Sequence, residues 1–248
     1  MTSQAGKNAI ITGGASGIGR AIVLNLAAAG ANVAVCDLDV EGAAAVAELV
    51  RKEGGRALPV QVDVSSPAAV LAAVARVREA LGNISVLVCS AGIGGWSTVP
   101  QITDQLWDQM LGVNLDGPFY CARAVLPDMM DAHWGRIVNI SSGAGQNGGG
   151  RGLAHYSAAK AGVLGLTKAM ALEFAAMGIT VNAIAPGVVD TPILKNVPGE
   201  HLEELVHRIP IGRLGRPEDI AAACAYLVSD GASYVTGQVL CPNGGFYM

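Results

Sequence analysis

The sequence has few charged and aromatic residues and no long hydrophobic run. Charged side chains make up 15% of its 248 residues and aromatic ones 4%, whereas 51% are hydrophobic, a composition that excludes an intrinsically disordered chain. Sixteen basic and twenty acidic side chains leave a net charge of −4, which excludes an electrostatic surface for nucleic acid or an anionic membrane. No apolar run approaches the ~20 residues of a membrane span, and the run at 8–12 is too short for a secretory signal.

Disulfide and metal-ligand patterns are also missing. The cysteines at 36, 89, 121, 224 and 241 are odd in number and lack a CxxC spacing, which indicates reduced core residues in a cytoplasmic protein. The histidines at 133, 155, 201 and 207 lack ligand spacing. We therefore predict no metal site.

What the sequence does have is a regular alternation of strand-like and helix-like segments. The strands are expected at 8–12, 32–36, 57–62, 84–89, 136–140, 180–184 and 238–241. The helices are expected at 18–29, 40–52, 66–81, 104–132 with an interruption near 117–118, 156–177 and 217–229. Such alternation predicts a single doubly wound, Rossmann-type α/β domain over residues 1–248, in which helices cover both faces of a seven-stranded parallel sheet.

A glycine-rich turn, Thr12 to Gly19, follows the first strand. Its glycines allow a tight turn and a close approach to a pyrophosphate, which the positive end of the next helix attracts. By itself this turn could be an ordinary loop. Asp37, however, ends the second strand eighteen residues after Gly19, where a carboxylate can bind the adenosine ribose and repel a 2′-phosphate. Neither Ser16 nor Leu38 is basic, so the pattern favours NAD(H) over NADP(H).

Three further residues suggest proton transfer. Tyr156 and Lys160 are four residues apart, on one face of a helix, and we expect the lysine to lower the tyrosine pKa from about 10. Ser142 follows a buried strand and would emerge at the carboxyl edge of the sheet, where open α/β sheets bind ligands. A surface pair and a turn serine remain open as alternatives at this point.

In their order and spacing these motifs resemble those of the short-chain dehydrogenase/reductase family over essentially the whole chain. The matching residues are the TGxxxGxG turn from Thr12 to Gly19, Asp63-Val64, Ala91-Gly92, Asn114, Ser142, Tyr156, Lys160, Pro186-Gly187 and Thr191. Two departures accompany the match. Ser90 stands where the family usually has asparagine, and the glycine-rich interval 143–155 is one residue longer than the commonest spacing. A flexible pocket wall and a surface excursion are equally open for that interval.

The resemblance implies a role for each matched residue. Tyr156 would be the general acid/base and Ser142 would polarise the substrate oxygen, while Lys160 would lower the tyrosine pKa and hold the nicotinamide ribose. Asn114 would support a proton-relaying water. Together with the glycine-rich turn and Asp37, the predicted cofactor-binding residues are Gly13, Ser16, Gly17, Ile18, Gly19, Asp37, Leu38, Asp63, Val64, Ser90, Ala91, Gly92, Tyr156, Lys160, Pro186, Gly187, Val189 and Thr191.

Substrate contacts are predicted for Ser142, Tyr156 and Trp96, and a substrate lid is predicted at about 190–214, with an amphipathic middle at 200–207. Trp96 suits stacking on a substrate ring or, more simply, packing on the lid. The family is commonly tetrameric, and the apolar helix faces within 156–177 and 221–228 are compatible with a homotetramer or a homodimer.

Taken together, the sequence predicts an NAD(H)-dependent oxidoreductase that interconverts a small secondary alcohol and a ketone. A 3-oxoacyl-acyl-carrier-protein or other acyl-thioester reductase is the alternative, which Asp37 disfavours because such reductases mostly use NADPH. A non-catalytic NAD-binding sensor and a cofactor-free lyase on this fold are rivals from other classes. The intact set of Asn114, Ser142, Tyr156 and Lys160 counts against the sensor, and Lys160 with the complete glycine turn counts against the lyase.

Overall fold

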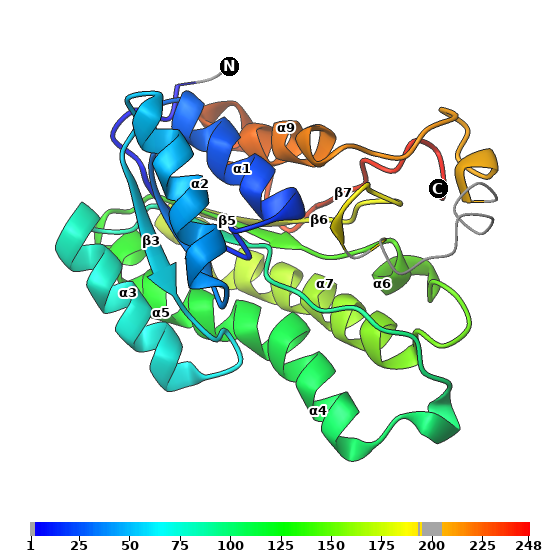
Figure 1. Ribbon diagram of the computed structural model, residues 1–248. Helices are drawn as coiled ribbons and strands as arrows, with labels where there is room; N and C mark the ends of the chain where they lie inside the picture. Colours follow the sequence, from blue (N-terminus) through cyan, green and yellow to red (C-terminus); the bar gives the residue numbers. More distant parts are fainter. Residues whose placement is uncertain (1–2, 193, 195–204) are drawn as a thin grey trace.

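The computed structural model describes residues 3–192, 194 and 205–248, and a parallel sheet runs through its centre (Figure 1). The seven strands are ordered β3-β2-β1-β4-β5-β6-β7, and every pairing is parallel. Their bounds are β1 Asn8–Thr12, β2 Asn32–Asp37, β3 Ala57–Gln61, β4 Val86–Cys89, β5 Gly135–Ile140, β6 Ile179–Ile184 and β7 Val239–Leu240. The predicted Rossmann-type sheet is confirmed.

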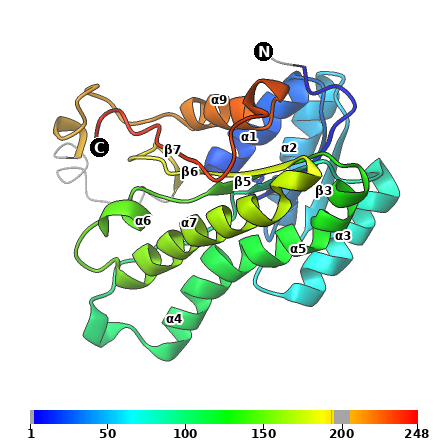
Figure 2. The same ribbon diagram turned by 180° about the vertical axis from the view of Figure 1, so that it is seen from behind.

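Helices cover both faces of this sheet. Their bounds are α1 Gly17–Ala28, α2 Val40–Lys52, α3 Pro67–Leu81, α4 Asp104–Leu111, α5 Gly117–Asp131, α6 Ala144–Asn147, α7 Ala154–Phe174 and α9 Pro217–Leu227. Figures 1 and 2 show α1, α2 and α9 on one face and α3, α5 and α7 on the other. Two buried clusters of aliphatic side chains fill the two interfaces. Because both faces are covered, β4, β5 and β6 are buried at every position.

The long helical region after β4 differs in detail from the prediction. The expected interruption near 117–118 is a π-helical turn, Gly112–Asp116, which joins α4 to α5 without leaving the helix path. Pro118 follows shortly after this turn and has no N–H to donate back along the continuous helix, a change in the hydrogen-bond pattern that the π-helical turn accommodates. The glycine-rich interval also contains the short helix α6, which the sequence did not predict. Of the helices in the described part of the chain, none is both long and apolar enough to cross a membrane.

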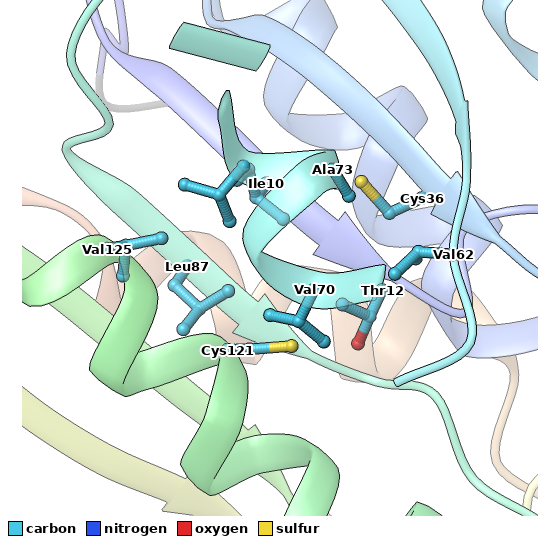
Figure 3. A pocket seen from close by; sticks show the side chains of 10 residues that line it. Ile10, Thr12, Cys36, Val62, Val70, Ala73, Leu87, Cys121 and Val125 are labelled. Carbon is cyan, nitrogen blue, oxygen red and sulfur yellow. The ribbon is translucent and has the colours of Figure 1, made fainter. Parts of the chain in front are cut away.

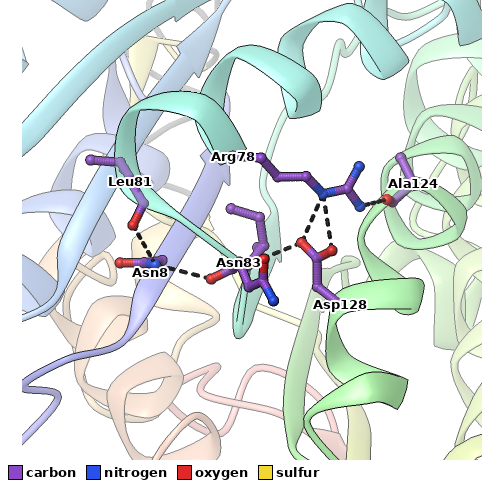
Figure 4. A network of polar contacts seen from close by, with 7 residues as sticks. Asn8, Arg78, Leu81, Asn83, Ala124 and Asp128 are labelled. Atoms are coloured by element: carbon purple, nitrogen blue, oxygen red, sulfur yellow. Dashed lines mark hydrogen bonds and ion pairs between the residues drawn. The ribbon is translucent and has the colours of Figure 1, made fainter.

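An ion pair joins α3 to α5 near the start of β4 (Figure 4). Arg78 Nε lies 3.0 and 2.9 Å from the two carboxylate oxygens of Asp128, and its Nη2 donates to the Ala124 carbonyl oxygen at 2.6 Å. Asp128 Oδ2 also accepts from the amide of Ile84 at 2.9 Å. Because this carboxylate has both a cation and a backbone donor, the network fixes the packing of two helices and one strand end.

A small apolar cavity lies between the sheet, α3 and α5 (Figure 3). Its lining includes Thr12 and the thiols of Cys36 and Cys121, but none of the residues predicted to bind cofactor or substrate. All five cysteines are free, and Cys241 alone is not fully buried. Burial raises the pKa of the Cys36 thiol and raises that of Cys224 to about 12, so these thiols stay protonated and pack as core side chains.

Candidate functional site

The candidate site begins where the strand order reverses, between β1 and β4. The carboxyl ends of two such strands flank the crevice in which doubly wound sheets bind ligands. Thr12 at the end of β1 accepts hydrogen bonds from the amides of Ser90 and Ala91, each at 3.1 Å. Thr12 therefore ties the glycine-rich turn to the loop after β4. Since it binds the backbone of Ser90, this link does not depend on the side chain in which the sequence departs from its family.

The glycine-rich turn forms a cradle, and side chains at its glycine positions would clash with the neighbouring backbone. Gly13 has a φ of +67°, and a Cβ added to it would lie 2.7 Å from the amide nitrogen of Ala91. A Cβ on Gly19 would overlap the carbonyl oxygen of Gly13. Ser16 forms no side-chain cap at the start of α1, whereas Asp39 and Ser66 cap the helices that follow them. This backbone, with amides open at a helix N-terminus, fits the pyrophosphate of a dinucleotide.

Asp37 lies beside this cradle with its carboxylate oriented by the backbone. Oδ2 accepts from the amide of Ala15 and Oδ1 accepts from the amide of Asp39, both at 3.0 Å. Leu38 next to it is 65% exposed, and Ser16 and Arg20 are exposed as well. Each carboxylate oxygen retains a lone pair for a ribose hydroxyl, and the exposed leucine offers an apolar surface for an adenine ring.

Further along the same edge lie the other residues predicted at the adenine. Asp63 is exposed, and its Oδ1 accepts from the amide and the hydroxyl of Ser65 at 2.9 and 2.6 Å. Val64 is buried against Gly117, where an added Cβ would lie 2.9 Å from the valine Cγ2. The absence of a side chain at position 117 thus lets the loop after β3 pack closely on α5.

The predicted catalytic side chains converge between β5 and α7. Ser142 follows β5, and its hydroxyl lies close enough to the Tyr156 phenol to lower the pKa of that phenol. Lys160, one turn along α7, has its Nζ 5.8 Å from the centre of the Tyr156 ring. The same hydroxyl of Ser142 accepts from the amide of Ala144 at 3.2 Å, which orients it at the start of α6. These three side chains can therefore act on one substrate oxygen.

The Tyr156 pKa moves opposite to our sequence-based expectation. Burial raises the pKa of the phenol, and the hydrogen bond from Ser142 only partly offsets that rise. Lys160 does not reverse the shift, because burial lowers its own pKa to about 8 and its Nζ donates to the carbonyl oxygen of Ile140 at 3.0 Å. In this state Tyr156 holds its proton and is a proton donor rather than a base.

Asn114 reaches the site from the π-helical turn and is fully buried. Its Nδ2 donates to the carbonyl oxygens of Ile93 and Met110, each at 3.0 Å, while its Oδ1 has no hydrogen-bond partner within the described residues. A Cβ added to Gly92 would lie 2.9 Å from that Oδ1 and 3.4 Å from Lys160 Nζ. The two polar atoms thus face the same glycine, and an unpaired buried acceptor beside a buried cation fits a bridging water.

Two loops close the crevice from the side of β6. Pro186 is buried directly after β6, and a Cβ on Gly187 would lie 2.9 Å from Asn243 Cα. Val189 is also buried, and Thr191 faces Gly17, where an added Cβ would lie 3.4 Å from the threonine Cγ2. The structure therefore brings the residues predicted to hold the nicotinamide back to the start of α1.

The wall between Ser142 and Tyr156 is tied to the protein at both ends. A Cβ on Gly145 would lie 2.7 Å from the main-chain carbon of Lys160, so α6 packs directly on α7. At the far end the carbonyl oxygen of Gly152 accepts from the amide of Ser97 at 2.9 Å. Trp96, in the loop joined by this bond, is 58% exposed. These contacts favour a pocket wall over a free surface excursion.

Some predicted features are not brought into the site. Residues 193 and 195–204, which include 11 of the 25 residues of the predicted lid and positions 200–204 of its amphipathic middle, lie outside the described residues. His155 is fully buried and points neither nitrogen at a hydrogen-bond partner among the described residues. Conversely, sequence reasoning assigned no role to Thr12, although it lies in the glycine motif, and did not single out Tyr247, whose hydroxyl donates to the Ala185 carbonyl oxygen at 2.5 Å.

Comparison with known proteins agrees with this geometry. A family model described as enoyl-(acyl carrier protein) reductase matches residues 13–247. The 3-oxoacyl-(acyl-carrier-protein) reductase FabG of Pseudomonas aeruginosa is 40% identical over 246 residues, 99% of both chains. Acetoacetyl-CoA reductase of Rhizobium meliloti is 44% identical over 241 residues, 96% of this chain and 98% of the relative. The hydroxy(phenyl)methylsuccinyl-CoA dehydrogenase subunit BbsD of Thauera aromatica is 41% identical over 237 residues, 96% and 95% of the two chains.

The match covers the glycine cradle, the crevice and the Ser142, Tyr156 and Lys160 cluster alike, and it extends over nearly the full length of each relative. The chain therefore belongs to the short-chain dehydrogenase/reductase family and is an oxidoreductase that acts on CH–OH groups, similar to 3-oxoacyl-acyl-carrier-protein and acetoacetyl-CoA reductases.

Proposed function

We propose that the protein reduces the 3-oxo group of an acyl thioester with NADH and catalyses the reverse oxidation of the matching 3-hydroxyacyl thioester. The observation that carries the proposal is the placement of the Ser142 hydroxyl, the Tyr156 phenol and the Lys160 ammonium together near the carboxyl end of β5. A protonated phenol paired with a hydroxyl is arranged to bind a ketone oxygen and protonate it. The relatives support the thioester, because all three names describe acyl-carrier-protein or coenzyme A thioesters.

This proposal reverses the order of two alternatives that the sequence left open. A simple secondary alcohol came first in the sequence analysis and the thioester second. The names of the relatives favour the thioester, and two of the three describe reductases. A non-catalytic NAD-binding sensor is disfavoured because the protein aligns Ser142, Tyr156 and Lys160 around one position.

Each residue of the site would have its own role in such a reaction. Ser142 and Tyr156 would bind the ketone oxygen, and Tyr156 would release its proton to that oxygen as negative charge develops on it. Lys160 and Asn114 would then return a proton to Tyr156 through the space beside Gly92. The glycine cradle, Asp37 and the Pro186–Gly187 loop would hold the dinucleotide, whose nicotinamide supplies or accepts the hydride when bound. The lid at about 190–214 would exclude water from these contacts.

A substrate comparison tests the proposal. In three separate assays the purified protein and NADH are mixed with acetoacetyl-CoA, with the N-acetylcysteamine thioester of acetoacetate, or with cyclohexanone. The absorbance of NADH is followed at 340 nm. We expect kcat/KM for both thioesters to exceed that for cyclohexanone by at least about 10-fold, since a thioester adds binding energy near the reacting carbon. Preference for the free ketone would restore the simple-alcohol alternative. NADH binding without turnover of any ketone would support the sensor instead.

The preference for NAD(H) rests on Asp37. Replacing Asp37 with alanine removes ribose hydrogen bonds and the charge that repels a 2′-phosphate, and each effect is worth about 1–3 kcal/mol. We expect the ratio of kcat/KM with NADH to that with NADPH to fall by about 30-fold or more. Glu41→Ala is the control, because it removes the same charge from an exposed position in the first turn of α2. An unchanged ratio in Asp37→Ala would remove the role assigned to this carboxylate.

Exposed apolar side chains support the proposed homotetramer. Leu172 on α7 is 86% exposed and Tyr226 on α9 is 47% exposed, so the two helix faces that the sequence marked as apolar each present a large hydrophobic group. Burial of such groups between subunits is favourable. Sedimentation velocity measures the outcome: a species of the 25.2 kDa chain mass alone would contradict assembly, and a dimer would mean that only one of the two faces is used.

A further inference from the structure

The C-terminal segment 243–248 lies against the two loops that follow β5 and β6. The carbonyl oxygen of Pro242 accepts from the amide of Gly187 at 3.3 Å, and the Asn243 backbone packs on that glycine. On the other side of the segment, the amide of Ile211 donates to the carbonyl oxygen of Gly244 at 3.1 Å. Figure 1 shows the C-terminus on the side of the molecule where α6 lies. The end of the chain is therefore built into the rim of the candidate active site.

Tyr247 connects the two loops directly. Its ring covers Gly143, the residue after Ser142, so closely that a Cβ on that glycine would overlap the ring edge at Cε1. Its hydroxyl donates to the carbonyl oxygen of Ala185, the residue before Pro186, at 2.5 Å. The amide of Gly143 spans the same gap and donates to the carbonyl oxygen of Pro186 at 3.0 Å.

The geometry of Tyr247 is fixed from both ends. Burial, with the nearby Cys241 thiol, raises the pKa of the Tyr247 phenol, so the hydroxyl stays protonated and keeps donating to Ala185. At the main chain, Asn243 Nδ2 donates to the carbonyl oxygen of Tyr247 at 2.6 Å. Neither the ring nor the hydroxyl can shift without breaking one of these contacts.

We propose that Tyr247 is a positioning residue of the active site, which fixes the Ser142 hydroxyl relative to the Tyr156 phenol by clamping Gly143 to Ala185. This inference deepens the proposed reductase function and rests on it. Within the described residues no hydrogen bond joins Tyr247 to Tyr156 or Lys160, so its effect passes through the backbone of the Ser142 loop. A displacement of that loop moves the Ser142 hydroxyl away from the Tyr156 phenol, and polarisation of the ketone oxygen depends on both groups.

The first test is Tyr247→Phe, which keeps the ring and removes only the bond to Ala185. We expect kcat to fall by about 5- to 10-fold, the worth of one hydrogen bond, while the NADH Kd changes by less than about 2-fold. Because the Ser142 hydroxyl lowers the Tyr156 pKa, its displacement should raise that pKa. Tyrosine ¹³Cζ NMR measures this pKa without turnover. Met248→Ala, at a fully exposed neighbour, is the control.

The second test is a double-mutant cycle with Gly143→Ala. Gly143 has a φ of −53°, which alanine adopts freely, so only the Tyr247 ring opposes the added methyl group. We expect Gly143→Ala alone to lower kcat by about 10-fold or more, but by less than about 2-fold in the Tyr247→Ala background, where the ring is absent. Such coupling between the two substitutions is expected if the Tyr247 ring clamps Gly143. A general loss of stability would instead lower kcat in both backgrounds.

Three results separate the possibilities. A raised Tyr156 pKa in Tyr247→Phe, together with coupling to Gly143, supports the clamp. An unchanged Tyr156 pKa, or a loss of kcat that is matched by an equal loss of NADH affinity, overturns it. If the unmodified protein reduces no ketone, the proposed function fails while the NMR comparison still decides whether Tyr247 controls the Ser142–Tyr156 contact.

Discussion

Tyr156→Phe is expected to lower kcat for ketone reduction by about 10³-fold or more and to leave the NADH Kd within about 3-fold of its original value. The substitution removes the proton that Tyr156 would transfer to the substrate oxygen, and general acid catalysis is worth about 10²–10⁴ in rate. The ring, which occupies space between Ser142 and Lys160, remains. Steady-state rates at 340 nm and NADH fluorescence titration measure the two quantities.

The matched control is Tyr226→Phe on α9, where the tyrosine is 47% exposed and lies on the opposite face of the sheet from α7 (Figure 2). We expect it to change kcat by less than about 2-fold. Retention of more than about a tenth of kcat in Tyr156→Phe would show that another group delivers the proton, and the role of the Ser142–Tyr156 pair would then have to be reassigned.

The parallel sheet was predictable because burial on both faces leaves a strong pattern. Val86–Cys89 is buried at every position and is a continuous apolar run, and Ile179–Ile184 is buried throughout and interrupted only by Thr180 and Asn182. The crossovers between parallel strands then require helices of the observed lengths. Ser142, Asp37 and the glycine turn followed from the same pattern, since each stands at the end of a strand or just after it and is therefore placed at the carboxyl edge.

Three features of the site have no corresponding pattern in the amino-acid sequence. The π-helical turn that carries Asn114 differs from an α-helix by a single residue, which hydrophobic periodicity does not resolve. The clamp by Tyr247 joins positions 143, 185 and 247, and contacts between distant segments are set by tertiary packing alone. The direction of the Tyr156 pKa also depends on burial, which outweighed the charge of a lysine four residues away.

Lys160→Met is expected to stabilise the protein while lowering kcat by about 10²-fold. Burial lowers the Lys160 pKa from 10.5 to about 8, so at pH 7 the fold holds a desolvated cation, at a cost of up to about 3 kcal/mol. No ion pair within the described part of the chain involves this ammonium. Methionine fills similar space without charge but leaves the Ile140 carbonyl oxygen unpaired, which costs about 1 kcal/mol. The free energy of unfolding of the variant is therefore expected to rise by about 1–2 kcal/mol, or Tm by a few degrees.

The pH dependence of this gain identifies its cause. Above about pH 8 the folded lysine is neutral, whereas the unfolded lysine stays protonated up to about pH 10.5. The unfolded state then binds more protons, so the original protein becomes more stable as pH rises through this window and the advantage of the variant shrinks.

Urea unfolding at pH 7 and pH 9.5 measures this advantage, with Lys168→Met, exposed on the same helix, as the control. An advantage that does not change with pH would attribute the gain to packing, and a less stable variant at pH 7 would show that the lysine's contacts outweigh its desolvation. A stabilised but inactive variant would mean that the site keeps a destabilising charge because its chemistry requires one.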